Sequence, residues 1–462
     1  MRTRILKISD VLDVRRMDVA YFINGNIGTG EQVLLSRYVD VKGGKRIPKG
    51  ESFAFEKTNY LYLRLSDVGD VENIDYDALK CISEDLFYRL KRYEIVNNQI
   101  VFSIAGTIGK VFVVKNIPKE KRVVLTENCA MLQPKNDKIL SEYISILLNC
   151  GFVQKQIEQN RIQTTIPKIG LDRIAKLKVP EIPLLGKQQE IVELYSNAQK
   201  ARTNKIQEVN ELLCNIDNYI SERLQIDVSQ NRSTNNILFY KKISSIIGNR
   251  MDVSFYKNRF EMISKKYPNE KLSSLVEVDP SISFNCFDDD MPISFVPMEC
   301  IDEEFGEIFD HRETAVSNAK GYTKFMENDL LWAKITPCMQ NGKSAIARNL
   351  INGFGCGSTE FFVMRPKSNN VLIEYIYLVL RHHEVLNAAQ NSFGGSAGQQ
   401  RVSNQYMKSI MIPYPDISTQ HEIIQTIYGL KDKAKQLQQE GNALLEEAKR
   451  KVEKMIMGEV YE

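Results

Sequence analysis

The chain has 462 residues, of which 43% are hydrophobic and 26% are charged, and its formal net charge is +3. This is the composition of an ordinary globular protein, and it leaves little room for long disordered stretches or for an overall strongly basic surface. The beginning of the chain lacks the apolar core of a signal peptide, and no stretch approaches the roughly 20 apolar residues of a membrane-spanning helix, so we expect a cytoplasmic protein of about two to four domains.

The eight cysteines and four histidines do not form a metal-binding pattern. No two cysteines stand in a CxxC pair, and so few histidines give a zinc site little support. We therefore expect reduced, mostly buried thiols and no metal in this chain.

Residues 1–183 are predicted to form a first α+β domain. Short apolar runs at 100–104, 111–114 and 123–125 are separated by glycine turns, a pattern typical of strands. Residues 141–159 carry apolar residues at helical spacing and predict a helix. Together these elements indicate a curved mixed sheet with helices.

A loop at residues 42–50 is rich in basic residues and glycine. Glycine lets backbone amides approach phosphates, and lysine and arginine supply a salt-dependent attraction to DNA. An ordinary solvated basic turn explains the same residues equally well. The candidate DNA-contacting residues in this loop are Lys42, Gly43, Gly44, Lys45, Arg46 and Lys49.

Further polar candidates follow in the first half. The hairpin at 103–110 combines small polar residues with a lysine directly after a strand, and such residues suit phosphates and base edges. A tight hairpin with a structural lysine is the other interpretation. The candidates are Arg64, Ser66, Thr107, Lys110 and Gln163.

Residues 184–239 are predicted to be a first spacer helix and a linker. The stretch 187–224 contains neither proline nor glycine and predicts a helix of about 38 residues, which is ~55 Å long at 1.5 Å per residue. The apolar stripe expected at a coiled-coil interface comprises Ile191, Leu194, Ala198, Val209, Leu212, Ile216 and Ile220.

Residues 240–415 are predicted to form a second α+β domain, with a helix at 372–386 as the counterpart of the first-half helix. The segment 334–343 follows a strand as the first-half hairpin does, and the glycine-rich loop 394–401 is flexible enough to enter a DNA groove. The candidates are Lys334, Thr336, Gln340, Asn341, Lys343, Ser358, Thr359, Ser396, Gln399, Gln400 and Arg401.

Residues 416–462 are predicted to form the second spacer helix, with Ser418 as a reasonable cap. Its apolar positions alternate in steps of three and four, with one gap at Gly441. We expect the two helices to form an antiparallel coiled coil that relates the domains by a pseudo-twofold axis. The alternative is that each helix packs only on its own domain. The stripe comprises Ile423, Ile427, Leu430, Ala434, Leu437, Leu444, Ala448 and Val452.

The chain is a tandem repeat of two halves of about 230 residues each. Short matches recur in the same order at a nearly constant offset, which chance does not plausibly produce. The matches join 16–22 with 250–256, 61–67 with 293–299, 98–101 with 328–331, 126–127 with 359–360, 179–183 with 412–415, and Gln189 with Gln420.

The sequence contains no recognisable catalytic motif. Residues 337–344 end like a phosphate-binding loop, but Pro337 stands where the first glycine of that loop is required. The signatures of metalloproteases, serine hydrolases, amino-methyltransferases and base-flipping deaminases are missing as well. We therefore expect that the chain is not an enzyme.

The ordered set of motifs resembles the specificity subunit family of type I restriction–modification systems. The resemblance covers essentially the whole chain. It implies that residues 1–183 and 240–415 are target recognition domains 1 and 2, which each read one half of a split DNA site. It also implies that the helices act as a ruler for the unread gap. The segments that lie between the matching motifs differ strongly from one half to the other. Two different half-sites are therefore implied, so the recognised DNA sequence should be asymmetric. One departure is that the second half has no counterpart of the basic loop. The strongest segments are 43–50, 103–110, 329–343, 355–361, 398–402 and the two proline-to-glutamine helix entries.

The same resemblance implies the partners. The chain would bind double-stranded DNA and hold two methyltransferase subunits, which carry S-adenosylmethionine, and ATP-dependent restriction subunits can join them. No cofactor in this chain and no membrane partner are implied. Two rival interpretations remain open: a stand-alone bipartite DNA-binding protein, and a coiled-coil scaffold whose globular ends bind protein or RNA.

Overall fold

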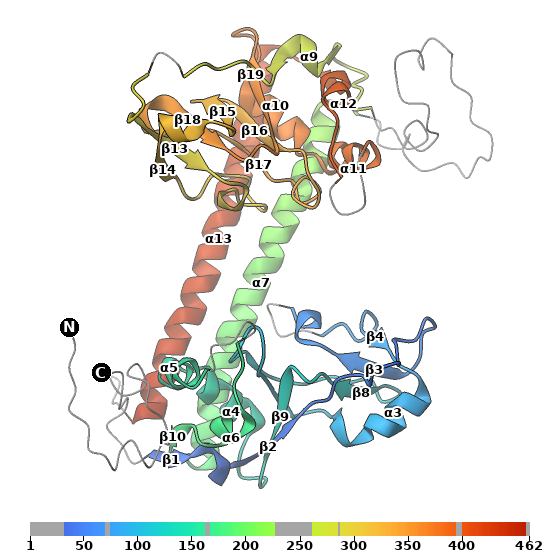
Figure 1. The fold of residues 1–462 in the computed structure, drawn as a ribbon, viewed down its shortest axis with the longest axis vertical. Coiled ribbons are helices and arrows are strands. Elements are labelled where there is room, and N and C mark those ends of the chain that lie inside the picture. The colour runs from blue at the N-terminus through green and yellow to red at the C-terminus, as the bar shows by residue number, and fades with distance from the viewer. Residues whose placement is uncertain are drawn as a thin grey trace. The chain divides into compact units, whose positions relative to one another are not determined.

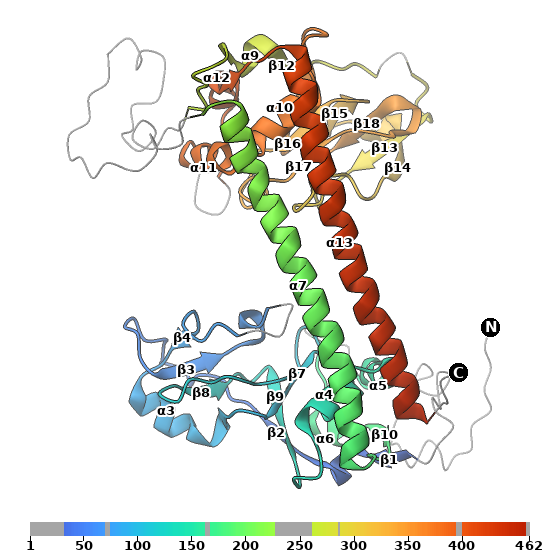
Figure 2. The ribbon, with the colours of Figure 1, turned by 180° about the vertical axis from the view of Figure 1, so that it is seen from behind.

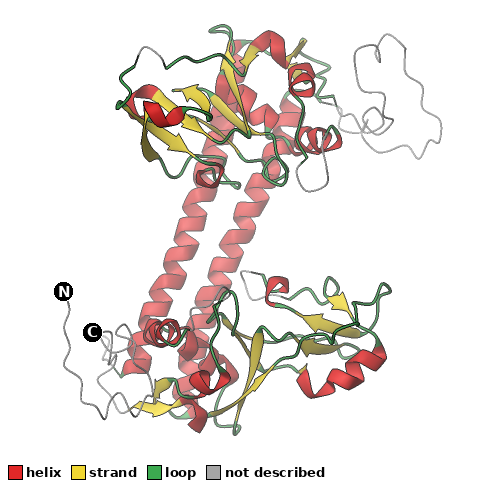
Figure 3. Ribbon diagram, viewed as in Figure 1, coloured by secondary structure: helices red, strands yellow, loops and turns green. Residues whose placement is uncertain are grey.

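The computed structural model describes residues 32–69, 74–161, 167–226, 261–284, 287–393 and 400–458. The predicted α+β class is confirmed, as Figure 3 shows by its helices and strands. The chain divides into two compact units, Met1–Ile206 with Gln438–Glu462 and Gln207–Leu437. No helix among the described residues is both long and apolar enough to cross a membrane.

The described residues of the first unit form two four-stranded sheets and a two-stranded sheet, whose strands the reader can follow in Figure 1. One sheet is antiparallel in the order β2-β9-β6-β7, and the other has the order β4-β3-β8-β5 with β3 and β8 parallel. The small sheet pairs β1 with β10. The strands are β1 (Gln32–Leu34), β2 (Val39–Gly43), β3 (Tyr60–Leu63), β4 (Lys80–Cys81), β5 (Glu94–Ile95), β6 (Ile100–Ser103), β7 (Val111–Val113), β8 (Arg122–Leu125), β9 (Cys129–Pro134) and β10 (Lys178–Pro180).

Among the described residues of this unit, the short α-helices are α3 (Glu84–Leu90), α4 (Ser141–Asn149), α5 (Gly151–Gln159) and α6 (Leu171–Ala175). The single helix predicted over 141–159 is wrong in one respect, because it is broken into α4 and α5. Cys150 lies between them with extended backbone angles of φ −63° and ψ 144°, so it ends one helix and begins the next. The break lets both helices pack into one apolar core with β6, β7 and β9.

The second unit repeats the same sheets in the same order. β12-β19-β16-β17 is antiparallel, β14-β13-β18-β15 has β13 and β18 parallel, and β11 pairs with β20. This agreement confirms the internal repeat predicted from the sequence. The strands are β11 (Asn269–Lys271), β12 (Val276–Val278), β13 (Pro292–Val296), β14 (Arg312–Ala315), β15 (Thr323–Met326), β16 (Leu330–Ala333), β17 (Ser344–Ile346), β18 (Phe354–Gly357), β19 (Phe361–Pro366) and β20 (Met411–Pro413).

Within the described part of this unit, the short α-helices are α9 (Leu272–Leu275), α10 (Ile373–Leu380), α11 (His383–Asn391) and α12 (Asn404–Ser409). The helix predicted over 372–386 is broken like its counterpart, here at the N-cap residue His382. The core contains the only tryptophan of the chain, Trp332, which is 1% exposed and stacks on Phe362 with 6.2 Å between ring centroids.

The structure corrects one of the sequence matches. Gln188, and not Gln189, is the counterpart of Gln420. Each of these two side chains is buried, accepts a hydrogen bond from the backbone N–H before the first core helix, and donates to two carbonyl oxygens. Gln189 is exposed. The match 16–22 with 250–256 lies outside the described residues.

Two long helices, α7 (Leu185–Arg223) and α13 (Ile417–Met457), contribute to both units. They pair antiparallel in each unit, as Figures 1 and 2 allow the reader to follow. In the first unit Lys205 forms an ion pair with Glu440, and Arg202 donates to Asn442. In the second unit Arg223 forms an ion pair with Glu422. The predicted antiparallel pairing is therefore confirmed within each unit.

Most of the predicted apolar stripe lies in the interior. The clear exception is Leu444, which is 41% exposed. At this level Gly441 faces α7 instead, since a Cβ placed on it would lie 3.5 Å from the side chains of Arg202 and Lys205. The gap in the stripe is thus the point where the backbones approach closely. The buried members are Ile191, Val209, Ile220, Ile423, Ile427, Ala434, Ala448 and Val452, and the half-buried ones are Leu194, Ala198, Leu212, Ile216, Leu430 and Leu437.

Each domain core is closed by the far end of the other domain's long helix. Val452 near the end of α13 packs into the first core, and Ile220 near the end of α7 packs into the second. An acidic residue on the same helix end caps a short helix: Glu453 accepts from Phe152 N at 3.2 Å, and Asp217 accepts from His383 N at 3.1 Å. The alternative in which each helix packs only on its own domain is therefore wrong.

Lys431 of α13 is a buried amine in the second unit, with 7% exposure. Its Nζ donates to the Phe305 carbonyl oxygen and to the Tyr377 hydroxyl, both at 2.9 Å. Phe305 packs between Val209 of α7 and Ala434 of α13. The lysine therefore holds a loop of the domain against both long helices.

The stability of the second unit should rise with pH above neutrality because of Lys431. Burial, helped by the positive charge of Arg381 and opposed by Glu307, lowers the pKa of this amine to about 7. The unfolded chain keeps the ordinary value, near 10.4, and so binds more protons between about pH 7 and 10. Urea unfolding followed by Trp332 fluorescence from pH 7 to 9.5 should show this rise, and Lys431→Met should remove it. Equal slopes for the two proteins would contradict the assignment.

Candidate nucleic-acid interface

A groove of about 690 Å³ opens on the first domain, and we call it the first groove. It lies between the basic loop, the end of β3 and the turn from β8 to β9. Four predicted DNA-contacting residues line it: Arg46, Lys49, Arg64 and Ser66. The structure therefore brings together side chains that lie up to 20 positions apart in the sequence.

Arg46 is held by a carboxylate that the sequence did not single out as part of the site. Its Nε donates to Glu127 Oε1 at 2.6 Å, while Thr126 Oγ1 donates to Glu127 Oε2 at 3.0 Å. Partial burial disfavours the charged form of Glu127 and by itself would raise its pKa. Hydrogen bonds from Arg46, from the backbone of Glu127 and from Thr126 outweigh this effect and hold the pKa below its ordinary value. Glu127 is thus a fixed anion that orients an arginine whose side chain is 78% exposed.

Arg64 is also oriented by an acid. Asp67 accepts from Arg64 Nε at 3.1 Å, from its Nη2 at 2.6 Å and from its backbone N–H at 2.9 Å. The ring of Phe53 lies 6.0 Å from the guanidinium carbon. This bidentate pair fixes the arginine at the rim of the first groove, next to the exposed Ser66.

The lysines of the basic loop, unlike Arg46 and Arg64, are not paired with an acid. Lys42, Lys45 and Lys49 are exposed, and none of them has an ion pair within the described part of the chain. The structure explains why residue 44 is a glycine, because a Cβ at this position would lie 2.0 Å from the Thr126 carbonyl oxygen. The N–H of Gly44 donates to the carbonyl oxygen of Cys129 at 2.9 Å. Its amide therefore joins the loop to the sheet rather than facing outward, whereas the three amines point to solvent. Gly43 lies at the end of β2 and is half-buried.

The two hairpin lysines are engaged inside the protein. Lys110 Nζ donates to Val68 O at 3.3 Å, and Lys343 Nζ donates to Met298 O at 3.2 Å and lies 3.6 Å from Glu303. These contacts match the interpretation of a tight hairpin with a structural lysine. Thr107, at the tip of the first hairpin, is exposed.

The second domain has a smaller groove of about 270 Å³, the second groove, which Lys334 lines together with Lys324 and Tyr322. Lys334 Nζ lies 5.4 Å from the ring centroid of Phe362. At the turn between β18 and β19, Thr359 is exposed and Ser358 Oγ accepts from the N–H of Glu360. Of the 334–343 candidates, Gln340 and Asn341 are exposed and Thr336 is half-buried, with its N–H on the carbonyl oxygen of Gln400.

Arg401 repeats the arrangement of Arg46. Its Nε and Nη2 donate to the carboxylate of Glu360 at 2.8 to 3.1 Å, and this pairing lowers the pKa of Glu360. The match of 126–127 with 359–360 was the signal that could have revealed both carboxylates from the sequence. Gln163, Ser396 and Gln399 lie outside the described residues.

Three side chains in the second unit, Asp217, His382 and His383, lie close enough to hold a metal ion. Their hydrogen bonds indicate a structural role instead. His382 Nδ1 accepts from Glu384 N at 3.2 Å, its Nε2 lies 3.0 Å from Ser221 Oγ, and Asp217 caps α11. Both ring nitrogens of His382 therefore already have partners, and binding a metal would cost one of these bonds.

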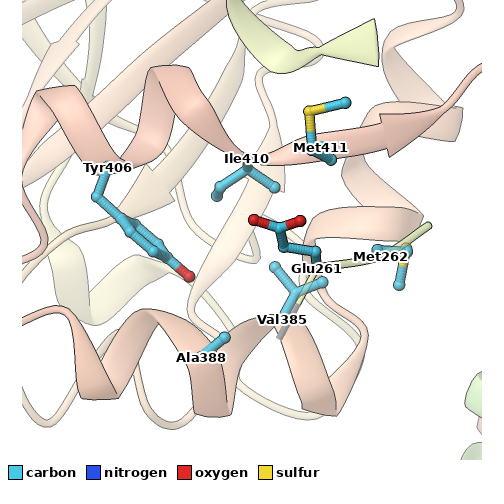
Figure 4. A pocket seen from close by; sticks show the side chains of 7 residues that line it. All are labelled: Glu261, Met262, Val385, Ala388, Tyr406, Ile410 and Met411. Atoms are coloured by element: carbon cyan, nitrogen blue, oxygen red, sulfur yellow. The ribbon is translucent and has the colours of Figure 1, made fainter. Parts of the chain in front are cut away.

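A small pocket between α11 and α12 does not offer a ligand site either (Figure 4). Its lining residues, which include Glu261, Val385 and Tyr406, enclose about 10 Å³. That is about the volume a single water requires. The two grooves are therefore the better candidates for an interface.

Fold and grooves together define a class: a protein with two like α+β domains, each with cationic side chains at a groove, and two long helices. Residues 38–212 and 264–447 match the family described as "Type I restriction modification DNA specificity domain". The chain belongs to this family, so the resemblance inferred from its motifs is confirmed.

Curated relatives are similar over part of their length. The type I restriction enzyme EcoEI specificity subunit of Escherichia coli is 35% identical over 186 residues, and the EcoAI specificity subunit of the same organism is 34% identical over 186 residues. Each match covers 40% of this chain and 31% of the relative. These relatives are specificity subunits, in keeping with the expectation of a chain without catalysis of its own.

Solved structures with a similar course of the chain include the S subunit of a type I restriction–modification system from M. genitalium. It has a TM-score of 0.41 and 12% identity, over 94% of this chain and 97% of that one. A chain from a structure on complex assembly and conformational transition of the type I R-M system has a TM-score of 0.48 and 10% identity, over 94% and 98%.

Proposed function

We propose that this chain is the DNA-recognition subunit of a type I restriction–modification complex and that it reads an asymmetric site in two parts. The observation that carries the proposal is the repeat itself: one domain architecture occurs twice, with differently lined grooves. In the division that we propose, residues 1–183 and 240–415 are the two readers. Residues 184–239 and 416–462 are the spacer helices.

The difference between the grooves supports an asymmetric target. The first groove carries Arg46, Lys49 and Arg64, whereas Lys334 and Lys324 line the second. The second half also has Asp288, Asp289 and Asp290 in the loop before β13, where the first half has its basic loop. Different side chains at the groove favour different base sequences.

In this proposal the chain also assembles its partners, in keeping with the family. Two methyltransferase subunits would bring S-adenosylmethionine, and restriction subunits would add ATP-driven activities. The chain itself would supply recognition and spacing, from the cytoplasm. A stand-alone DNA-binding protein differs only in lacking these partners, so co-purification of a methyltransferase from the natural host separates the two.

The exposed lysines of the basic loop should contribute phosphate contacts. Lys45→Ala with Lys49→Ala should weaken binding to a non-specific duplex. It should also reduce the slope of log K against log salt by about 2, because each phosphate contact adds about 0.9. Lys119→Ala with Lys176→Ala removes two exposed lysines that do not line the groove and serves as the control. If both double variants keep the original slope, the loop does not contact DNA.

The long helices should set the gap between the half-sites. Removing seven residues from each helix around the facing pair Lys205 and Glu440 shortens both by ~10 Å and preserves the heptad phase. The preferred gap should shrink by about three base pairs of 3.4 Å, or binding should be lost. Deleting the heptad from α7 alone is the comparison, and it should abolish binding. A gap that stays unchanged in the paired deletion would contradict the ruler.

The decisive experiment is selection from a random duplex pool. The chain is purified with co-expressed partners, and the bound DNA is sequenced. Two short, different motifs at a fixed gap are expected. If no sequence is enriched at low salt with the methyltransferase present, recognition is excluded and the coiled-coil scaffold that binds protein or RNA becomes the better reading.

A further inference from the structure

The turn on one side of the first groove carries an asparagine that was not among the predicted candidates. Asn128 lies between β8 and β9, lines the first groove and is exposed. Among the described residues that line this groove, it is the only one with a side-chain amide. An amide differs from the arginines and lysines around it, because it carries a hydrogen-bond donor and an acceptor side by side and has no net charge.

The backbone of this turn is fixed to two sheets. The carbonyl oxygen of Asn128 accepts the N–H of Ile104, directly after β6, at 2.8 Å. Two residues earlier, the N–H of the buried Thr126 donates to the carbonyl oxygen of Leu63 in β3 at 3.1 Å. The backbone of Asn128 therefore keeps its place at the groove, and only the rotation of a short side chain has to be fixed when a ligand binds.

The amide of Asn128 is available to such a ligand. It has no hydrogen-bond partner within the described ranges of the chain. The adjacent Glu127 is fully engaged and does not compete for it. Its Oε1 accepts from Arg46. Its Oε2 accepts from Thr126 and Tyr62. The turn thus presents one carboxylate that is used inside the protein and one amide that is not.

The amide and the cations at this groove suit different parts of a DNA duplex. Lys49 is exposed and attracts phosphates by its charge, whereas a neutral amide adds nothing to that attraction. An asparagine amide matches adenine in the major groove, because its oxygen accepts from N6 and its NH2 group donates to N7. The hydroxyls of Ser52 and Ser66, which also line the groove, pair with several bases and discriminate less.

We propose that Asn128 reads an adenine in one half of the DNA site. The inference rests on the proposed function and deepens it, because it names a base and the side chain that recognises it. The match of 126–127 with 359–360 places Phe361 at the corresponding position of the second domain, and Phe361 is 1% exposed. This adenine contact therefore belongs to the first domain alone, in keeping with two different half-sites.

The test compares the base preferences of variants in the complex with its co-expressed partners, by selection from a random duplex pool. Asn128→Ala should lower the preference for adenine at one position of one half-site by about 10- to 100-fold and leave the other half-site unchanged. Asn128→Asp keeps the size of the side chain but replaces the donor by a second acceptor. The preference at that position should then move towards cytosine, whose N4 amino group donates.

A second asparagine of the same domain provides the matched control. Asn59 is exposed and does not line the groove, so Asn59→Ala should leave both motifs intact. A duplex with 7-deazaadenine at the selected position lacks the N7 acceptor. The unmodified chain should bind it more weakly than the adenine duplex, whereas Asn128→Ala should bind both duplexes equally.

A phosphate contact would give a different result. Asn128→Ala would then weaken binding to all sequences alike and leave both motifs unchanged, which would overturn the proposal. Full affinity with unchanged motifs in both variants at position 128 would overturn it as well, because the amide would then not meet DNA. If the unmodified chain enriches no sequence, the proposed function itself has failed, and this inference fails with it.

Discussion

Replacing Asp329 by alanine should lower the free energy of unfolding of the second domain by about 3 kcal/mol. Asp329 is 1% exposed, accepts two hydrogen bonds from Arg365 at 2.7 and 2.8 Å, and accepts the N–H of Met326 at 2.7 Å. Removing one partner of a buried pair costs about 3–5 kcal/mol. The arginine is one-third exposed and can regain water, so the lower end of that range applies.

The repeat provides a matched control for this change. Gln99 occupies the same position in the first domain, accepts Val96 N at 3.0 Å and donates to Gln133 at 3.0 Å. Because this amide pair lies at the surface, Gln99→Ala should cost no more than about 1 kcal/mol. Urea unfolding measured by Trp332 fluorescence follows the second domain, and far-UV circular dichroism follows both. Similar losses in the two variants would show that the pair in the second domain is not the buried anchor described here.

Replacing Gln188 by leucine should cost about 2–3 kcal/mol of stability in the first domain. The side chain is 1% exposed, and its three hydrogen bonds satisfy Leu140 N and the carbonyl oxygens of Lys138 and Pro183. Leucine fills a similar volume but leaves these groups without partners, and one buried unsatisfied group costs about 1–3 kcal/mol. The loss should also speed hydrogen exchange at the Leu140 amide.

The neighbouring residue separates this effect from general changes in the helix. Gln189→Leu makes the same chemical change one position later on an exposed face, where surface substitutions stay within about 0.5 kcal/mol. Thermal unfolding of the two variants side by side is sufficient. Equal midpoints would mean that the buried glutamine does not join the helix to the domain.

The repeat and the long helices could be predicted because they depend on periodic apolar patterns. The breaks at Cys150 and His382 could not, since apolar residues at helical spacing continue on both sides of each position, and the extended backbone or cap geometry comes from tertiary packing. The choice of Gln189 over Gln188 failed for a similar reason. Two adjacent glutamines are alike in a pattern, and only burial distinguishes them.

The candidate site was predictable in its cations and not in its acids. The basic loop at 42–50 stands out by its charge and the 394–401 loop by its glycines, so Lys45, Arg46 and Arg401 were among the predicted candidates. Glu127 and Glu360 belong to short matches that looked like simple marks of the repeat, and their role depends on partners 81 and 41 positions away. Lys110 and Lys343 are the opposite case. The sequence pattern made them candidates for DNA contact, but each amine donates to a backbone carbonyl oxygen of the protein itself.

The closure of the first core by the end of α13 has a consequence for synthesis on the ribosome. Phe152 and the Glu453 that caps its helix are 301 positions apart. Translation proceeds at about 5–20 residues per second, so Val452 and Glu453 are synthesised roughly 15 to 60 seconds after the surface of the first domain on which they pack. During that interval apolar side chains of α4 and α5 are open to other nascent chains and to chaperones. The first domain to be translated is therefore among the last to become complete.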